Sequence, residues 1–130
     1  MEKNVNIITG LILDVSIKIH NELGPGLFES VYENVLCYES HKRSLFVQTQ
    51  KAIPVVYDGI KFEDGFRADM IVNNLVIVEI KSIDLLGPLH YKQIHTYLKL
   101  SNIKDGLLIN FNVNLLKEGF HRIFNNHLKV

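Results

Sequence analysis

Two neighbouring apolar segments of the chain contain the residues that could do chemistry. Asp69 lies in the first segment, Glu79 and Lys81 lie in the second, and Asn73-Asn74 between them is a strong turn signal. Because side chains alternate between the two faces of a strand, Glu79 and Lys81 share one face. An aspartate on the adjacent strand would supply a second carboxylate. Two carboxylates and a lysine at one point favour a divalent-metal site with a charge stabiliser beside it.

The length of the turn decides whether these side chains can meet. A two-residue turn would place Asp69 on the wrong face of the sheet for Glu79. If Val72 instead pairs with Val76, Asp69 lies opposite Glu79. The sequence therefore predicts a loop over residues 73–75, with a bulge.

The rest of the chain predicts helices and strands around these two segments. Apolar residues at three- and four-residue spacing indicate helices, and short apolar runs bounded by turn residues indicate strands. Glu63-Asp64-Gly65 is expected to separate two strands. The order predicts a mixed α/β layer in a single domain over residues 1–130. The expected helices are 8–23, 28–42 and 88–100, and the expected strands are 46–57, 60–62, 66–72, 75–81, 107–111 and 120–124.

Composition limits the class of protein. The chain has 130 residues with 14 basic and 14 acidic side chains, so no global basic field indicates a nucleic-acid partner. Cys37 is the only cysteine, which excludes an internal disulfide and favours a reducing compartment. No signal peptide is recognisable, and no stretch approaches the roughly 20 apolar residues of a membrane span. We therefore expect a cytoplasmic protein with no membrane segment.

The ordered set of polar residues resembles the PD-(D/E)XK nuclease superfamily. In that pattern an aspartate on one strand and a Glu-x-Lys element on the next bind the metal and activate water. Ala68 stands where the superfamily usually has a proline. The matching residues are Asp69, Glu79-Ile80-Lys81, Glu29 on an upstream helix, and Gln93 with Tyr97 on the next helix.

A second motif narrows the resemblance. The segment 26–32, Gly-Leu-Phe-Glu-Ser-Val-Tyr, is similar to the signature of the small bacterial proteins named GxxExxY, and the resemblance covers nearly the whole chain. It implies a restriction-endonuclease-like α/β fold in which helices flank a central mixed β-sheet. It also implies hydrolysis of phosphodiester bonds with Mg²⁺ or Mn²⁺, in DNA by preference or in RNA.

The resemblance assigns catalytic roles to Asp69, Glu79, Lys81 and Glu29. The carboxylates of Asp69, Glu79 and Glu29 and the backbone carbonyl of Ile80 would bind the metal, because Mg²⁺ prefers oxygen ligands. Lys81 would orient the attacking water or offset charge in the transition state. The alternatives are plain ion pairs, between Asp69 and Arg67 or Lys81 and between Lys81 and Glu79. For Glu29 the alternative is a favourable position at the positive end of a helix dipole.

Three further residues are expected to support the site. Gln93 and Tyr97 stand four apart on one helical face and resemble a Gln-x-x-x-Tyr element that positions substrate or metal ligands. The alternative is a buried tyrosine with a hydrogen-bonded glutamine. Tyr32, three residues after Glu29, could hold the Glu29 carboxylate or belong to the core.

Partners follow from the same expectation. Arg67, Lys92 and Lys99 are candidate phosphate contacts, since such contacts supply most of the sequence-independent affinity for nucleic acid. A catalytically silent nucleic-acid-binding or regulatory module is one alternative. A homodimeric interaction domain is another, and an exposed apolar face on the helix at 8–23 would favour it.

Overall fold

The computed structural model describes residues 4–125, in which five strands form one mixed sheet in the order β1-β2-β3-β4-β5. β3 and β4 are parallel, and all other neighbours are antiparallel. The expected mixed α/β layer is therefore confirmed, although residues 1–3 and 126–130 of the predicted domain lie outside the described residues. The strands are β1 (Val47–Tyr57), β2 (Ile60–Val72), β3 (Val76–Lys81), β4 (Asp105–Asn110) and β5 (Phe120–Phe124).

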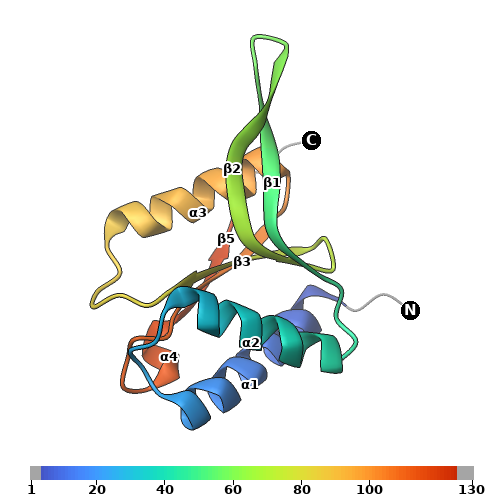
Figure 1. The fold of residues 1–130 in the computed structure, drawn as a ribbon. Helices are drawn as coiled ribbons and strands as arrows, with labels where there is room; N and C mark the ends of the chain where they lie inside the picture. Colours follow the sequence, from blue (N-terminus) through green and yellow to red (C-terminus); the bar gives the residue numbers. More distant parts are fainter. Residues whose placement is uncertain (1–3, 126–130) are drawn as a thin grey trace.

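Helices cover both faces of this sheet. α1 (Val5–Leu23) and α2 (Glu29–Lys42) lie together on one side, and α3 (Pro88–Ser101) lies on the other (Figure 1). α3 forms the crossover that a parallel β3–β4 pair requires. A short helix, α4 (Leu116–Gly119), precedes β5 and was not predicted from the sequence. No helix within residues 4–125 has both the length and the apolar character needed to cross a membrane.

The apolar stripe of α1 is the centre of the larger core. Asn4 caps the helix by accepting the Ile7 N–H at 2.9 Å, and Gly24 ends it with a φ of 72°. The stripe packs on Tyr32 and Leu36 of α2 and on the sheet. The apolar face that a homodimer would need on α1 is therefore buried in the monomer. The buried stripe comprises Ile8, Ile12, Val15 and Ile19.

β3 is buried on both faces, and this sets the environment of its polar residues. Val76, Val78 and Ile80 belong to the core beneath α1 and α2, whereas Ile77 belongs to the core beneath α3. The alternation of strand side chains then directs Glu79 to the α3 side of the sheet. A carboxylate there is removed from water, which is costly unless it is hydrogen-bonded.

The loop between β2 and β3 has the predicted length. Val72 pairs with Val76, so residues 73–75 form the connection. Asn73 and Asn74 have positive φ angles of 51° and 55°, a conformation that asparagine tolerates. The prediction about register is therefore confirmed, and it aligns Asp69 with Glu79.

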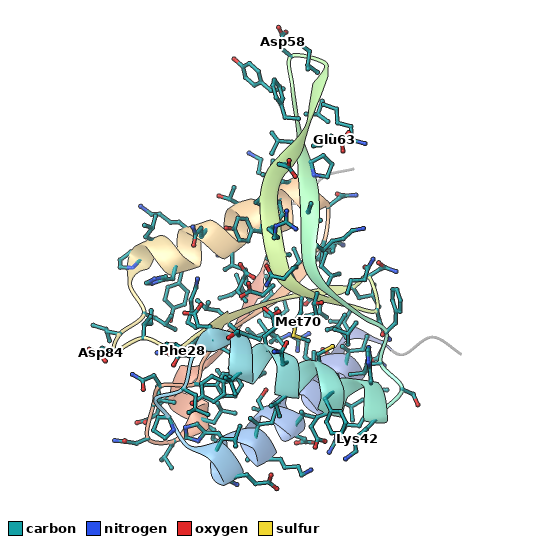
Figure 2. The ribbon with its side chains drawn as sticks, in the orientation of Figure 1. Phe28, Lys42, Asp58, Glu63, Met70 and Asp84 are labelled. Carbon is teal, nitrogen blue, oxygen red and sulfur yellow. The ribbon has the colours of Figure 1, made fainter. Side chains whose placement is uncertain are left out.

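The β1–β2 hairpin corrects one expectation. Glu63-Asp64-Gly65 does not separate two strands but lies inside the continuous strand β2. The register shifts between Ile53 and Val55, opposite this segment, because Pro54 has no N–H to donate to the ladder. A side chain at Gly65 would collide with Val55, so glycine is required at that point. The hairpin projects from the body as an arm, with Asp58 at its tip (Figure 2).

Candidate functional site

The carboxylates of Asp69 and Glu79 each accept a hydrogen bond from the backbone of the strand that carries the other residue. The Cα pairing between β2 and β3 ends at Met70 and Val78, and side chains bridge the strands beyond that point. The Asp69 N–H donates to the Glu79 carboxylate at 2.9 Å, and the Ile80 N–H donates to the Asp69 carboxylate at 2.9 Å. Glu79 is only 6% exposed, and Asp69 is half-buried. The two carboxylates predicted to meet are thus brought together.

The two carboxyl groups of the pair do not both ionise readily. Burial and then the neighbouring Asp69 charge raise the pKa of the Glu79 carboxyl to about 8, against the opposing effects of the Asp69 backbone N–H and of Lys81. No lysine, arginine or histidine forms an ion pair with either carboxylate among the residues that the structure describes. A cation bound here would supply the positive charge that favours the ionised form of Glu79.

The simple ion pairs considered as alternatives are not formed. The Arg67 guanidinium donates to the Gln50 carbonyl at 3.0 Å rather than to Asp69. Lys81 is half-buried and has no carboxylate within salt-bridge distance in the described part of the chain. Its ammonium is near enough to lower the pKa of Glu79 without neutralising the site.

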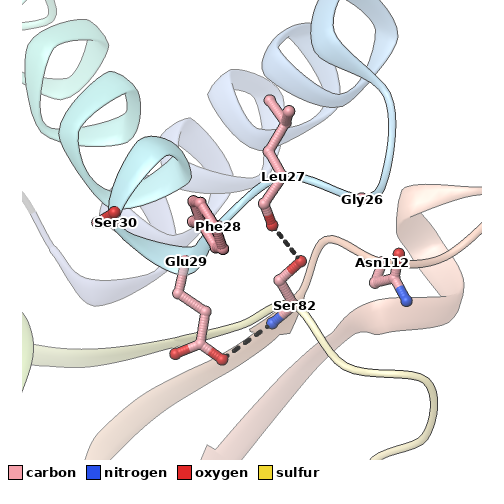
Figure 3. Close-up of a pocket in the computed structure, with 7 residues that line it drawn as sticks. All are labelled: Gly26, Leu27, Phe28, Glu29, Ser30, Ser82 and Asn112. Carbon is pink, nitrogen blue, oxygen red and sulfur yellow. Dashed lines mark hydrogen bonds between the residues drawn. The ribbon is translucent and has the colours of Figure 1, made fainter.

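Glu29 lies where the first turn of α2 meets the end of β3. Its carboxylate accepts the Ser82 N–H at 3.2 Å, and the Ser82 hydroxyl donates to the Leu27 carbonyl at 2.6 Å (Figure 3). Ser82 directly follows Lys81, so these contacts hold the start of α2 next to the Glu-x-Lys element. Glu29 itself is exposed, and its position in the first turn also suits the helix dipole.

An open pocket of about 620 Å³ lies at this junction. Its wall combines main-chain and side-chain polar groups with one large aromatic ring (Figure 3). The volume is in the range of small-molecule sites. The lining residues are Gly26, Leu27, Phe28, Glu29, Ser30, Ser82 and Asn112.

Glu33 and Gln50 also contact the site and were missed in the sequence. The Gln50 amide donates to Glu33 at 2.8 Å and to Asp69 at 3.4 Å. Burial raises the pKa of Glu33, and the charges of Asp69 and Glu29 act in the same direction. The four-residue spacing of Glu29 and Glu33 on one helix face was the available signal. The position of Gln50 could not be foreseen, because it depends on a positive φ of 49° within β1.

A family model described as the PD-(D/E)XK nuclease superfamily matches residues 6–123. The chain belongs to the PD-(D/E)XK nuclease superfamily. Searches of curated proteins and of solved structures returned no match. The five-stranded mixed sheet flanked by helices agrees with the restriction-endonuclease-like fold of this superfamily.

PD-(D/E)XK nucleases generally use divalent metals, and the oxygen donors of this site fit such an ion. Asp69 and Glu79 each accept a backbone N–H with one carboxylate oxygen, and the other oxygen of Asp69 makes a long contact with the Gln50 amide. Within residues 4–125, no three His, Cys, Asp or Glu side chains are grouped to hold a metal. The fit thus rests on two carboxylates, to which Glu29 does not add a third in this arrangement.

The Gln-x-x-x-Tyr element expected from the sequence is only partly assembled. Tyr97 stacks on Phe66 with ring centroids 4.0 Å apart. Burial raises the pKa of Tyr97, and the nearby charges of Glu79 and Asp69 raise it as well, which places its hydroxyl in the field of the carboxylate pair. Gln93 is exposed and makes no side-chain hydrogen bond to any described residue.

Tyr32 belongs to the core rather than to the carboxylate site. Its ring is fully buried and stacks on Phe111 with centroids 4.4 Å apart. Its hydroxyl donates to the Gly24 carbonyl at 2.6 Å and accepts the Leu27 N–H at 3.2 Å. The expectation that Tyr32 holds the Glu29 carboxylate is therefore wrong, because the hydroxyl is used to fix the α1–α2 turn.

The candidate phosphate contacts lie on two elements beside the pair. Arg67 is exposed on β2, two residues before Asp69. Lys92 and Lys99 are exposed on α3, the helix that carries Tyr97, and α3 contains no acidic residue. The local charge of α3 is therefore positive, although the chain as a whole is neutral.

Proposed function

We propose that this protein is a Mg²⁺- or Mn²⁺-dependent nuclease that hydrolyses phosphodiester bonds in DNA, with RNA as the alternative polymer. The observation that supports this most directly is the reciprocal hydrogen bonding of Asp69 and Glu79 on adjacent strands, with Lys81 two residues further along β3. Membership of a nuclease superfamily supplies the class of reaction. Fold alone would not establish it.

Asp69, Glu79 and the Ile80 carbonyl are the proposed metal ligands, with Glu29 at the same end of β3 in a supporting role. A bound divalent ion would act as a Lewis acid and lower the pKa of water. Burial and the backbone N–H donors fix the orientation of the two carboxylates before substrate arrives. Lys81 would orient the attacking water and offset the charge that develops on the phosphate. The Tyr97 hydroxyl would support the pair from α3, with Gln93 one turn before it.

Assignment to the GxxExxY proteins is a further part of the proposal. The segment 26–32 places its glutamate at the end of β3 and its tyrosine in the core, so both motif positions have a physical role. Gly26 has a φ of 98°, which favours glycine at the first motif position. A bacterial origin and a cytoplasmic location would follow from this assignment.

Nucleic acid would bind across α3 and β2. Lys92 and Lys99 lie on the exposed side of α3, and Arg67 lies beside Asp69 on β2. Contacts of these side chains with phosphates would position the polymer without reading its sequence. DNA is preferred here as the substrate, but the same contacts would serve RNA.

The decisive experiment is cleavage of labelled single- and double-stranded DNA and RNA with Mn²⁺, Mg²⁺ or EDTA, beside a Lys81→Ala variant. Metal-dependent cleavage that Lys81→Ala removes would support the proposal and identify the polymer. Folded protein that neither cleaves any substrate nor binds Mn²⁺ would overturn the enzymatic role.

A catalytically silent nucleic-acid-binding or regulatory module is the second candidate. Residues 4–125 contain no group of three carboxylates, so a metal would be held by few protein ligands, and this favours the silent module. Such a module should gain no stability from Mn²⁺ and should bind nucleic acid equally well after Glu79→Ala. The homodimeric alternative has less support, because the apolar face of α1 is buried in the monomer.

A further inference from the structure

Phe28 is a large aromatic side chain with no evident role in folding. Its ring is 83% exposed, and it belongs to neither core cluster of the described residues. It occupies the N-cap position of α2 without capping the helix through its side chain. Single exposed apolar side chains are common on protein surfaces, so the place of this ring, and not its exposure alone, carries the argument.

The ring lies in the pocket next to the end of β3, the strand that carries Glu79 and Lys81. It lines the same pocket as Glu29 and Ser82, whose hydrogen bond joins α2 to the end of β3 (Figure 3). Ser82 directly follows Lys81 in the chain. A polymer with its reactive phosphate at the carboxylate pair would therefore place an adjacent nucleotide near Phe28.

We propose that the Phe28 pocket is a subsite for an unpaired nucleobase, which stacks on the ring of Phe28. This inference rests on the proposed nuclease function. A base has an aromatic face whatever its identity, so stacking is tolerant of sequence. Ser30 and Asn112 on the pocket wall offer polar groups to the edge of the base or the sugar.

The subsite selects a class of substrate. A base inside a duplex is already stacked on both faces, and moving it onto a side chain costs its pairing and stacking. An unpaired base carries no such cost. The pocket therefore favours single-stranded DNA or RNA, or the unpaired end of a duplex, over intact double helix.

Substitution of Phe28 with leucine is the test, because leucine keeps apolar bulk and removes the aromatic face. We expect Phe28→Leu to lower kcat/KM on a single strand by about 5-fold to 150-fold, the equivalent of the ~1–3 kcal/mol of stacking per base. Phe28→Trp should restore the wild-type value. In the presence of Mn²⁺, the non-cleaving Lys81→Ala variant should quench the fluorescence of 2-aminopurine in a bound single strand. This quenching should be lost when Phe28→Leu is added to the same variant. Thermal unfolding should be unchanged, since the ring is exposed.

Phe46→Leu is the matched control. Phe46 is an exposed phenylalanine whose backbone contacts Asn73, at the opposite end of β3 from Ser82. If the wild type cleaves and the Phe28→Leu and Phe46→Leu variants cleave equally well, the subsite is overturned while the proposed nuclease function stands. A wild-type protein that neither binds nor cleaves any nucleic acid would overturn both.

Discussion

The carboxylate of Asp69 accepts the N–H of Ile80, while the carboxylate of Glu79 accepts the N–H of Asp69, each at 2.9 Å. Each acid is thus oriented by the strand that carries the other. Two negative groups are held together at a buried point by backbone donors, without a basic side chain in salt-bridge contact among the described residues. The arrangement fixes both carboxyl groups in advance at the expense of a raised Glu79 pKa, which a cation bound between the two groups would lower.

Removal of one acid should abolish stabilisation by metal. We expect Mn²⁺ to raise the Tm of the wild type. At a Mn²⁺ concentration a hundredfold above its Kd, the free energy of unfolding should increase by ~2.7 kcal/mol. Asp69→Asn should remove this increase, because it deletes one of the two charges that attract the ion. Thermal denaturation with a Mn²⁺ titration measures it, and Asp14→Asn, an exposed acid on α1, is the control. An equal Mn²⁺ shift in Asp69→Asn would exclude the proposed ligand set.

Tyr97 should affect catalysis more than stability. Tyr97→Phe keeps the stacking on Phe66 but removes the hydroxyl that lies in the field of Glu79 and Asp69. We expect kcat to fall by about 10-fold to 100-fold, as for other groups that orient metal ligands, with Tm nearly unchanged. Tyr91→Phe on the same helix is the control, because Tyr91 contacts His121 instead. If both variants cleave at the wild-type rate, Tyr97 has no role in the site.

Tyr32, in contrast to Tyr97, should affect stability more than catalysis. Tyr32→Phe leaves the Gly24 carbonyl and the Leu27 N–H without their buried partner. The loss should lower the free energy of unfolding by about 1–3 kcal/mol, as measured by urea denaturation. Tyr38→Phe, at an exposed tyrosine of the same helix, should cost little. A Tyr32→Phe protein as stable as Tyr38→Phe would contradict the assigned role of the hydroxyl.

Glu39 should control stability in acid. Its side chain is 9% exposed and lies 2.8 Å from Lys18 and 2.9 Å from Arg43. Hydrogen bonds from Lys18 and then Arg43 lower the pKa of Glu39 to about 2, below the roughly 4.3 of an unfolded glutamate. The unfolded state therefore binds the proton first, so this contribution is complete above about pH 4.3 and is lost as the pH falls towards 2.

The measurement is Tm against pH for the wild type and Glu39→Gln. The variant should be less stable at neutral pH and should lose part of the decline between pH 4.3 and 2. Glu22→Gln, an exposed glutamate on α1, should follow the wild-type curve. Parallel curves for wild type and Glu39→Gln would show that the ion pairs do not stabilise the fold.

The sequence allowed the meeting of Asp69 and Glu79 to be predicted because two local rules govern it. Strand alternation fixes the face of each side chain, and the loop length fixes the register. The helices α1, α2 and α3 followed from apolar spacing in the same way, whereas the four-residue helix α4 did not. Contacts that depend on geometry between distant elements were not accessible, as Gln50 shows by joining Glu33 of α2 to Asp69 of β2.

Two errors have the same origin in tertiary context. Glu63-Asp64-Gly65 has the composition of a turn, but the pairing of Phe62 and Phe66 on either side of it keeps it within β2, opposite Pro54. Tyr32 shares a helix face with Glu29 by spacing, yet its long side chain reaches into the core and turns its hydroxyl to Gly24. In both cases contacts with other parts of the folded chain overrode the local preference of the segment.

The loop at residues 73–75 matters to both the stability of the protein and its chemistry, because it permits the pairing of Val72 with Val76, which sets the partner of every paired residue along β2 and β3. A slip of this pairing by one residue would turn Met70 and Val78 to opposite faces and separate Asp69 from Glu79 in the same step. A change of loop length that leaves Val72 opposite Val76 would preserve both relationships. The core and the carboxylate pair therefore depend together on the strand pairing and not on the number of residues in the loop.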